Sequence, residues 1–310
     1  KTFKNNGLIY KNDELGRCYP VSECASSVLD CLKKGLQYTH ILLETEVKNI
    51  VKENNRYYVE YKTGGELFDY VVCCSGSMAS NLGSIKAYDY LKQLNVGISN
   101  LKASLAPVIV YEDLSLLKGV RVKCNVKLLD EQGCVCYDEN GEILFKEDAL
   151  SGIVVFNASS IINRKNSKYK IVLDLSCGMS EDELHSYIRD NSADVSNIFK
   201  GFLNDKLAEY ILKRISINNE IKGETINKII KEICCLSFNV KGLYPLKEAQ
   251  VCSGGIKLSE INENLELNKY SNVYVAGELL DIDGISGGYN LQFAWSSAGV
   301  IANDIIRKLN

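Results

Sequence analysis

The residues best suited to chemistry lie near the C-terminal end of the chain, between Gly277 and Leu291. Gly277 and Glu278 follow the apolar run 273–276, and the glycine-punctuated stretch 281–288 leads into a long run of small and apolar residues. Glycine lets a backbone approach a ligand closely, and a carboxylate accepts hydrogen bonds from ligand hydroxyls. The N–H groups that begin a helix can stabilise electron-rich carbonyls or a charged ring nitrogen. A tight turn would need only the two adjacent glycines, so the whole run indicates a site for a polar cofactor.

Two separated parts of the chain have the pattern of one α/β domain that would position this site. In residues 1–95, apolar residues recur at helical spacing over 21–37, and strand-like runs follow. Residues 246–310 contain a buried-strand pattern at 273–277 and helical spacing over 289–308. The strands expected in the first part are 39–52, 56–62 and 67–74, the last two joined by a hairpin turn at Thr63-Gly64-Gly65.

The residues between these two parts have other patterns. Residues 103–176 contain short β-rich segments divided by turn pairs such as Asn140-Gly141, which is typical of an antiparallel sheet or barrel. From Ser180 to about Leu236 the spacing becomes helical, and Ser180 with Glu183 has the spacing of a capping box. The strands expected in the β-rich part are 104–111, 119–129, 133–137, 142–145, 151–157 and 169–175.

The composition is that of a globular protein and argues against several other classes. Apolar residues make up 46% of the chain and charged residues 24%, and the net charge is −3. This charge provides no general attraction to nucleic acid or to an anionic membrane. No apolar run approaches the roughly 20 residues that span a bilayer, and the start, Lys1 to Pro20, has no signal-peptide pattern. We therefore expect a cytoplasmic protein without a nucleic-acid or membrane partner.

The 12 cysteines have spacings that favour neither a metal site nor a disulfide framework. No C-x-x-C occurs, and only His40 and His185 could supply imidazole. Most of the cysteines lie in apolar stretches, where a thiol behaves as a small hydrophobic group. We therefore expect no metal and reduced thiols. Cys252 is the one candidate for a reactive thiol, and inert burial is the favoured alternative for it.

The run from Gly277 to Gln292, G-E-L-L-D-I-D-G-I-S-G-G-Y-N-L-Q, resembles the signature of the HI0933-like flavoproteins. These are the BaiN/YhiN group of NAD(P)/FAD-dependent oxidoreductases, with the pattern G-E-x-L-D-x-x-G-x-x-G-G-Y-N-x-Q. Matches to other motifs of this family are scattered over nearly the whole chain. They are Gly16-Arg17-Cys18-Tyr19-Pro20-Val21-Ser22, Gly141-Glu142-Ile143-Leu144-Phe145 with Leu150-Ser151-Gly152, and Ala249-Gln250-Val251-Cys252-Ser253-Gly254-Gly255-Ile256.

The resemblance implies an α/β fold with an FAD-binding, Rossmann-like domain of the glutathione-reductase class, interrupted by a β-barrel-like insert and a helical insert. It also implies two-electron chemistry on FAD, with NAD(P)H as the expected donor and a small molecule as substrate. No general acid–base pair stands out, so no catalytic residue is assigned. The expected parts are 1–98 and 251–310 for the FAD-binding domain, 99–178 for the barrel-like insert, 179–236 for the helical insert and 237–250 for its return strand.

The resemblance assigns the cofactor to particular residues. Val47 would lie beside the adenine through its backbone, and Glu278 and Asp283 would lie near the ribityl chain or the ring. Tyr289 would either stack near the flavin or, as the favoured alternative, pack the loop onto the core. The residues expected to bind the cofactor are Val47, Ser75, Gly76, Gly277, Glu278, Asp283, Gly287, Gly288, Tyr289, Asn290 and Leu291.

Departures from the family pattern lead to two rival hypotheses. The family opens with a strand–G-x-G-x-x-G–helix that holds the pyrophosphate, and this motif does not occur in the sequence. Cys252 replaces the usual Thr, and Lys146-Glu147 stand where Thr-His is typical. One rival is therefore a truncated, non-catalytic flavoprotein remnant that acts as a binding or scaffold protein. The other is nucleic-acid modification, against which the acidic balance of charge argues.

Overall fold

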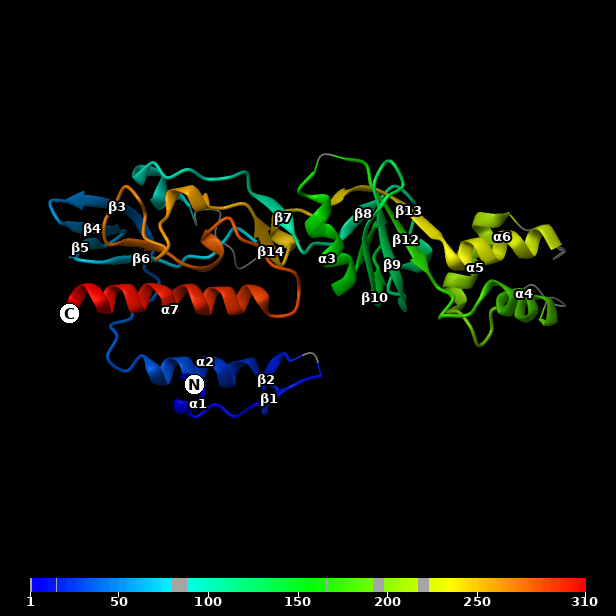
Figure 1. Cartoon of the computed structure of the whole chain (residues 1–310), viewed down its shortest axis with the longest axis horizontal. Helices are drawn as coiled ribbons and strands as arrows, with labels where there is room; N and C mark the ends of the chain where they lie inside the picture. The colour runs from blue at the N-terminus through cyan, green and yellow to red at the C-terminus, as the bar shows by residue number, and fades with distance from the viewer. Residues whose placement is uncertain (1, 15, 80–87, 166, 192–197, 217–222) are drawn as a thin grey trace.

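The computed structural model describes residues 2–14, 16–79, 88–165, 167–191, 198–216 and 223–310. An α/β part, a β-barrel and a group of helices follow one another along the longest axis (Figure 1). Helix α7 (Tyr289–Leu309) runs along the α/β part. Within these ranges, no helix combines the length and the apolar character that crossing a membrane requires.

The α/β part is built on a pair of parallel strands from opposite ends of the sequence. β6 (Val71–Cys73) pairs with β15 (Val273–Val275), and β15 is buried along its whole length. This pairing joins the two parts that the sequence patterns assign to one domain. The other strands here are the antiparallel β3 (Val47–Glu53), β4 (Arg56–Tyr61) and β5 (Gly64–Phe68), and the antiparallel pair β7 (Lys102–Ser104) and β14 (Val251–Ser253).

Six strands close into a small barrel in the order β10-β11-β8-β13-β12-β9. Its core contains fully buried apolar residues such as Val126, Ile171 and Phe238. The structure therefore confirms the expected barrel. The strands are β8 (Val108–Val110), β9 (Arg121–Leu129), β10 (Val135–Phe145), β11 (Ala149–Ser151), β12 (Lys170–Asp174) and β13 (Leu236–Leu243).

The prediction of a strand over 151–157 is wrong, because helix α3 (Ile153–Ile162) begins within it. The β-branched residues at its start favour a strand locally, but packing on β10 buries Val154 and Val155 and overrides that preference. Gly152 has a φ of 113° and turns the chain into the helix. A Cβ there would lie 2.4 Å from the backbone oxygen of Glu142, so only glycine lets the chain pass this close to β10.

The expected turn at Asn140-Gly141 is also wrong, since β10 continues through both residues in its ladder with β9. A Cβ at Gly141 would lie 2.3 Å from Cγ1 of Val154, so this glycine permits close packing of α3 on the strand. The turn between β9 and β10 lies at 130–134, where the Gly133 amide donates to the Asp130 oxygen (3.0 Å).

The other predicted elements differ mainly in extent. The helix expected over 21–37 is α2 (Ala25–Gly35), and the strand expected over 67–74 is divided between the end of β5 and β6. The pairing of Tyr61 with Gly64 confirms the hairpin, but its turn lies at Lys62-Thr63, and Gly64 and Gly65 belong to β5. The capping box of Ser180 and Glu183 is present. The remaining elements are α1 (Thr2–Asn5), β1 (Tyr10–Asn12), β2 (Cys18–Pro20), α4 (Glu181–Asp190), α5 (Asp205–Ile215) and α6 (Gly223–Cys234).

A cluster of polar side chains anchors the C-terminal end of α7 to the α/β core. The Tyr274 hydroxyl donates to Asp304 (2.7 Å), and Lys308 Nζ donates to the Tyr274 oxygen (2.8 Å) and to Glu266 (2.6 Å). Burial alone would raise the pKa of Glu266, but hydrogen bonds from Lys308 and from the Asn272 amide lower it overall. The hydrogen bond from Tyr274 lowers the pKa of Asp304.

We expect protonation of the two carboxylates in this cluster to lower the stability of the protein in acid. The pKa values of Glu266 and Asp304 are lower in the folded state than in the unfolded chain, so their contribution is complete above the unfolded pKa of about 4 and is lost as pH falls through the folded pKa. The free energy of unfolding in urea should therefore fall between about pH 7 and pH 3, and less steeply in Lys308→Met. Equal pH dependence of the two proteins would contradict this role for Lys308.

Candidate functional site

The candidate site begins where β15 ends. The Ala276 amide donates to the Cys73 oxygen (3.0 Å), which extends the contact with β6 by one residue. Gly277 then turns the chain with a φ of 63°, and its amide donates to Ser297 Oγ of α7 (3.0 Å). The segment after β15 is therefore fixed to the sheet on one side and to α7 on the other.

Glu278 joins this segment to two others. Its Oε1 accepts hydrogen bonds from the Cys252 amide of β14 (2.8 Å) and from the Ser77 hydroxyl after β6 (2.8 Å). Cys252 is fully buried and Ser77 nearly so, so this carboxylate satisfies donors that water does not reach. Glu278 therefore connects the segment after β15 with β14 and with the segment after β6.

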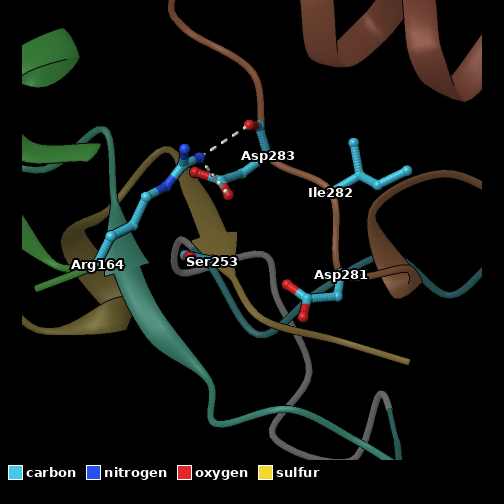
Figure 2. A pocket seen from close by; sticks show the side chains of 5 residues that line it. All are labelled: Arg164, Ser253, Asp281, Ile282 and Asp283. Atoms are coloured by element: carbon cyan, nitrogen blue, oxygen red, sulfur yellow. Dashed lines mark hydrogen bonds and ion pairs between the residues drawn. The ribbon is translucent and has the colours of Figure 1, made fainter. Parts of the chain in front are cut away.

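A pocket of about 420 Å³ opens beside the loop that follows. Figure 2 shows the lining residues: Arg164 after α3, Ser253 of β14, and Asp281, Ile282 and Asp283 of the loop. Arg164 reaches across from the barrel and donates to Asp283 Oδ1 (3.1 Å). The Asp283 side chain is only 5% exposed, whereas that of Arg164 is 56% exposed. The pocket therefore lies where the barrel meets the α/β part.

The two pocket carboxylates are held by serine hydroxyls. Ser99 Oγ donates to Asp281 (2.6 Å), and Ser104 Oγ donates to Asp283 (2.7 Å). These bonds fix the direction of each carboxylate and leave acceptor capacity on both, because an ionised carboxylate has about four acceptor positions. The arrangement suits a ligand that carries hydroxyl groups.

The glycine-rich loop ends at an uncapped helix start. Gly288, the N-cap of α7, has a φ of 93°, and no side chain caps the helix. No atom lies within 4 Å of the position that a Cβ of Gly288 would occupy. The Asn290 side chain holds the loop instead, since it accepts from the Gly284 amide (2.8 Å) and donates to the Gly284 oxygen (3.0 Å). The first N–H groups of α7 therefore have no partner inside the helix and none from a capping side chain.

Tyr289 and Leu291 project outward from this start, with 60% and 79% of their surface exposed. The Tyr289 ring lies beside Gly287, where a Cβ would be 3.4 Å from Cε2 of the ring. The favoured expectation that Tyr289 packs the loop onto the core is therefore wrong.

The remaining expected residues lie at two other places. Ser75 and Gly76 follow β6, next to β15; Ser75 Oγ is 2.9 Å from the Tyr90 hydroxyl, and no atom lies within 4 Å of a Cβ placed on Gly76. Val47 begins β3 and packs partly buried against the α/β core. In Figure 1, β3 lies toward the C-terminal end of α7, and the glycine-rich loop leads into the opposite end.

Residues 1–304 match the family model of the HI0933-like protein Rossmann domain. The chain belongs to this family. The match confirms the resemblance carried by the run from Gly277 to Gln292, and it establishes an α/β protein with a Rossmann-type domain. Membership also indicates an oxidoreductase that binds a flavin or a nucleotide.

Several curated proteins are similar to this HI0933-like chain over nearly its whole length. The 3-dehydro-bile acid delta(4,6)-reductase of Clostridium scindens is 26% identical, and the match covers 95% of this chain and 76% of the relative. The ribosomal RNA dihydrouridine synthase of Haemophilus influenzae is 25% identical, covering 97% and 78%. The enzyme of the same name from Escherichia coli is 23% identical, covering 97% and 77%.

Cys252 of the HI0933-like chain is a buried thiol. It is fully buried, and desolvation raises its pKa to about 12. A thiolate is the reactive form of cysteine, so this position supports inert burial over reactivity. All 12 cysteines are free, and no three metal-ligating side chains meet among the residues that the structure describes.

The sequence missed part of the site. Asp281 lies inside the signature run, but only its position beside Ser99 and the pocket distinguishes it from its neighbours. Arg164 and Ser253 belong to other segments, and no local pattern marks them. Lys146 and Glu147, which depart from the family pattern, lie in surface contacts: Lys146 lies over the Tyr244 ring (4.1 Å) and Glu147 pairs with Lys118 (2.7 Å).

Proposed function

We propose that this HI0933-like protein is an FAD-dependent reductase that uses NAD(P)H as electron donor. The observation that carries the proposal is the uncapped start of α7, where Gly288 has a left-handed backbone conformation and open space at its Cβ position. The positive end of the helix dipole and its free N–H groups suit an electron-rich ring edge such as that of a flavin. Gly287 and the backbone of Tyr289, Asn290 and Leu291 would face that edge.

The other residues fit an extended dinucleotide along α7. Asp281 and Asp283 are oriented by serines and would accept hydrogen bonds from the ribityl hydroxyls, and Gly76 leaves open space beside the strand end. Val47 begins β3, which lies toward the C-terminal end of α7 (Figure 1), and its backbone would lie near the adenine. When bound, FAD supplies the hydride transfer, and the chain supplies binding, orientation and a fixed electrostatic environment.

In this proposal the cofactor domain is of the glutathione-reductase class. It comprises residues 1–98 and 251–310 together with β7. The rest of 99–178 forms the barrel with the return strand in 237–250, and the helical insert is 179–236. Glu278 acts as a positioning residue, because its carboxylate is bound to Cys252 and Ser77.

The names of the relatives favour reduction of a carbon–carbon double bond. A delta(4,6)-reductase and a dihydrouridine synthase both carry names that denote addition of hydrogen across such a bond. A small molecule with a double bond next to a carbonyl is therefore the proposed substrate. Uridine in RNA is the second candidate, since two relatives are named for it. The charge argument against nucleic acid stays a prediction.

An anaerobic redox cycle tests this function. NADH or NADPH added to the flavin-loaded natural protein should bleach the visible flavin band, and 2-cyclohexenone should restore it. Restoration by a uridine-containing RNA but not by the enone would favour the second candidate. Absence of bleaching with either nucleotide would overturn the reductase proposal and favour the remnant.

A further inference from the structure

We infer that Asn157 of the barrel helix α3 is a positioning residue for the loop that leads into α7; its effect on a bound flavin rests on the proposed function. Asn157 is 4% exposed. Its Oδ1 accepts a hydrogen bond from the Ser286 amide (2.9 Å), and its Nδ2 donates to Glu139 Oε2 (3.2 Å). One buried amide therefore links barrel strand β10 to the glycine-rich loop.

The two partners allow the Asn157 amide only one orientation. An ionised Glu139 carboxylate can only accept, so it selects the NH₂ group. The Ser286 backbone N–H can only donate, so it selects the oxygen. Rotating the amide by half a turn would break both bonds, and the cost of leaving buried polar groups unpaired opposes this.

A contact at Ser286 affects the start of α7 more directly than the other contacts of the loop described above. Asn290 fixes Gly284, and Arg164 contacts Asp283, but both of these contacts lie further upstream in the loop. Ser286 is two residues before Gly288, and Ile285 next to it is 49% exposed. The hydrogen bond that the Ser286 amide donates to Asn157 therefore holds the short stretch on which the position of the Gly288 backbone depends.

Further hydrogen bonds hold both the helix that carries Asn157 and its partner Glu139 in place. The Ser159 hydroxyl of α3 accepts from the Ala106 amide (3.0 Å), and Asn163 Nδ2 donates to the Ala103 oxygen (2.7 Å), so the helix is tied to the chain around β7. Glu139 also accepts a hydrogen bond from the Tyr137 hydroxyl. Burial raises the pKa of Tyr137, so this hydroxyl stays protonated and keeps donating.

Hydrogen–deuterium exchange of the peptide covering 281–288 tests the inference on the natural protein without added FAD. In Asn157→Ala, exchange of this peptide should rise about tenfold, because one buried hydrogen bond is lost. The matched control is Asn262→Ala: this asparagine also accepts from a backbone amide, that of Glu266, and donates to the Glu266 carboxylate, but it does not contact the loop, so exchange of 281–288 should not change. Wild-type exchange in Asn157→Ala, or an equal rise in the control, would overturn the inference.

A second variant leaves Asn157 in place. Glu139 is only partly buried, and Glu139→Leu removes the group that orients the amide, so exchange of 281–288 should rise here too. No rise would overturn the link to the barrel. With FAD added, the visible band of the bound flavin should shift in Asn157→Ala and Glu139→Leu and stay unchanged in Asn262→Ala. A wild-type protein that binds no FAD would reject the proposed function, while the exchange data alone would still decide the role of Asn157.

Discussion

Replacing Gly254 by alanine should destabilise the protein by more than about 3 kcal/mol. Gly254 has a φ of 96°, and a Cβ there would lie 2.2 Å from the backbone oxygen of Asn100 and 3.2 Å from Cα of Leu101. Backbone atoms cannot rotate away as a flexible side chain can, so the chain near β14 would have to move. Urea denaturation at neutral pH measures the loss.

The control for this prediction is Gly119→Ala. Gly119 has a φ of 86° but no atom within 4 Å of its Cβ position, so alanine there should cost only about 1–2 kcal/mol of backbone strain. The difference between the two variants isolates the overlap with Asn100. Equal losses would contradict the close approach of the Asn100 backbone to Gly254 at the end of β14. That approach bears on the site, because the adjoining Ile256 amide donates to the Leu279 oxygen (2.8 Å) just before the loop.

Replacing Gly288 by valine should weaken FAD binding about tenfold to a hundredfold more than replacing it by alanine. Both variants carry a Cβ at a φ of 93°, and the β-branched valine adds further backbone strain, which the free energy of unfolding without FAD measures. No protein atom lies within 4 Å of the Cβ position, so the larger side chain meets little protein. The valine side chain would, however, overlap a flavin bound against the start of α7, as proposed.

The measurement is a titration of each Gly288 variant with FAD, followed by the visible spectrum, beside its free energy of unfolding without FAD. Similar unfolding energies with very different affinities would place the ligand at this helix start. Equal affinities of the alanine and valine variants would show that FAD does not lie there.

Local patterns predicted the parts of the fold that local physics determines. Glycine spacing and the small-residue run predicted the loop 281–288 and helix α7, and alternating short strands predicted the barrel. Helix α3 was mispredicted because Ile153, Val154 and Val155 favour strands, and only packing on β10 decides otherwise. Gly141 indicated a turn and Gly152 fell inside the expected strand, but both glycines mark close packing of the helix.

The sequence predicted site residues that lie in one continuous segment, but not contacts between segments that are far apart in the sequence. Gly277, Glu278 and Asp283 belong to one continuous run, so their proximity follows from sequence. The contact of Asn157 with Ser286 spans 129 residues, and that of Arg164 with Asp283 spans 119. No local pattern encodes such contacts, because they arise only when the barrel docks beside the loop.

The visible absorption spectrum of the purified protein tests the central claim most directly. The protein would be purified, incubated with FAD and passed through gel filtration to remove free cofactor. We predict that the flavin bands elute with the protein and that Gly288→Val elutes without them. A folded wild-type protein that emerges colourless after incubation with FAD would contradict the assignment of the loop and the start of α7 as a flavin site.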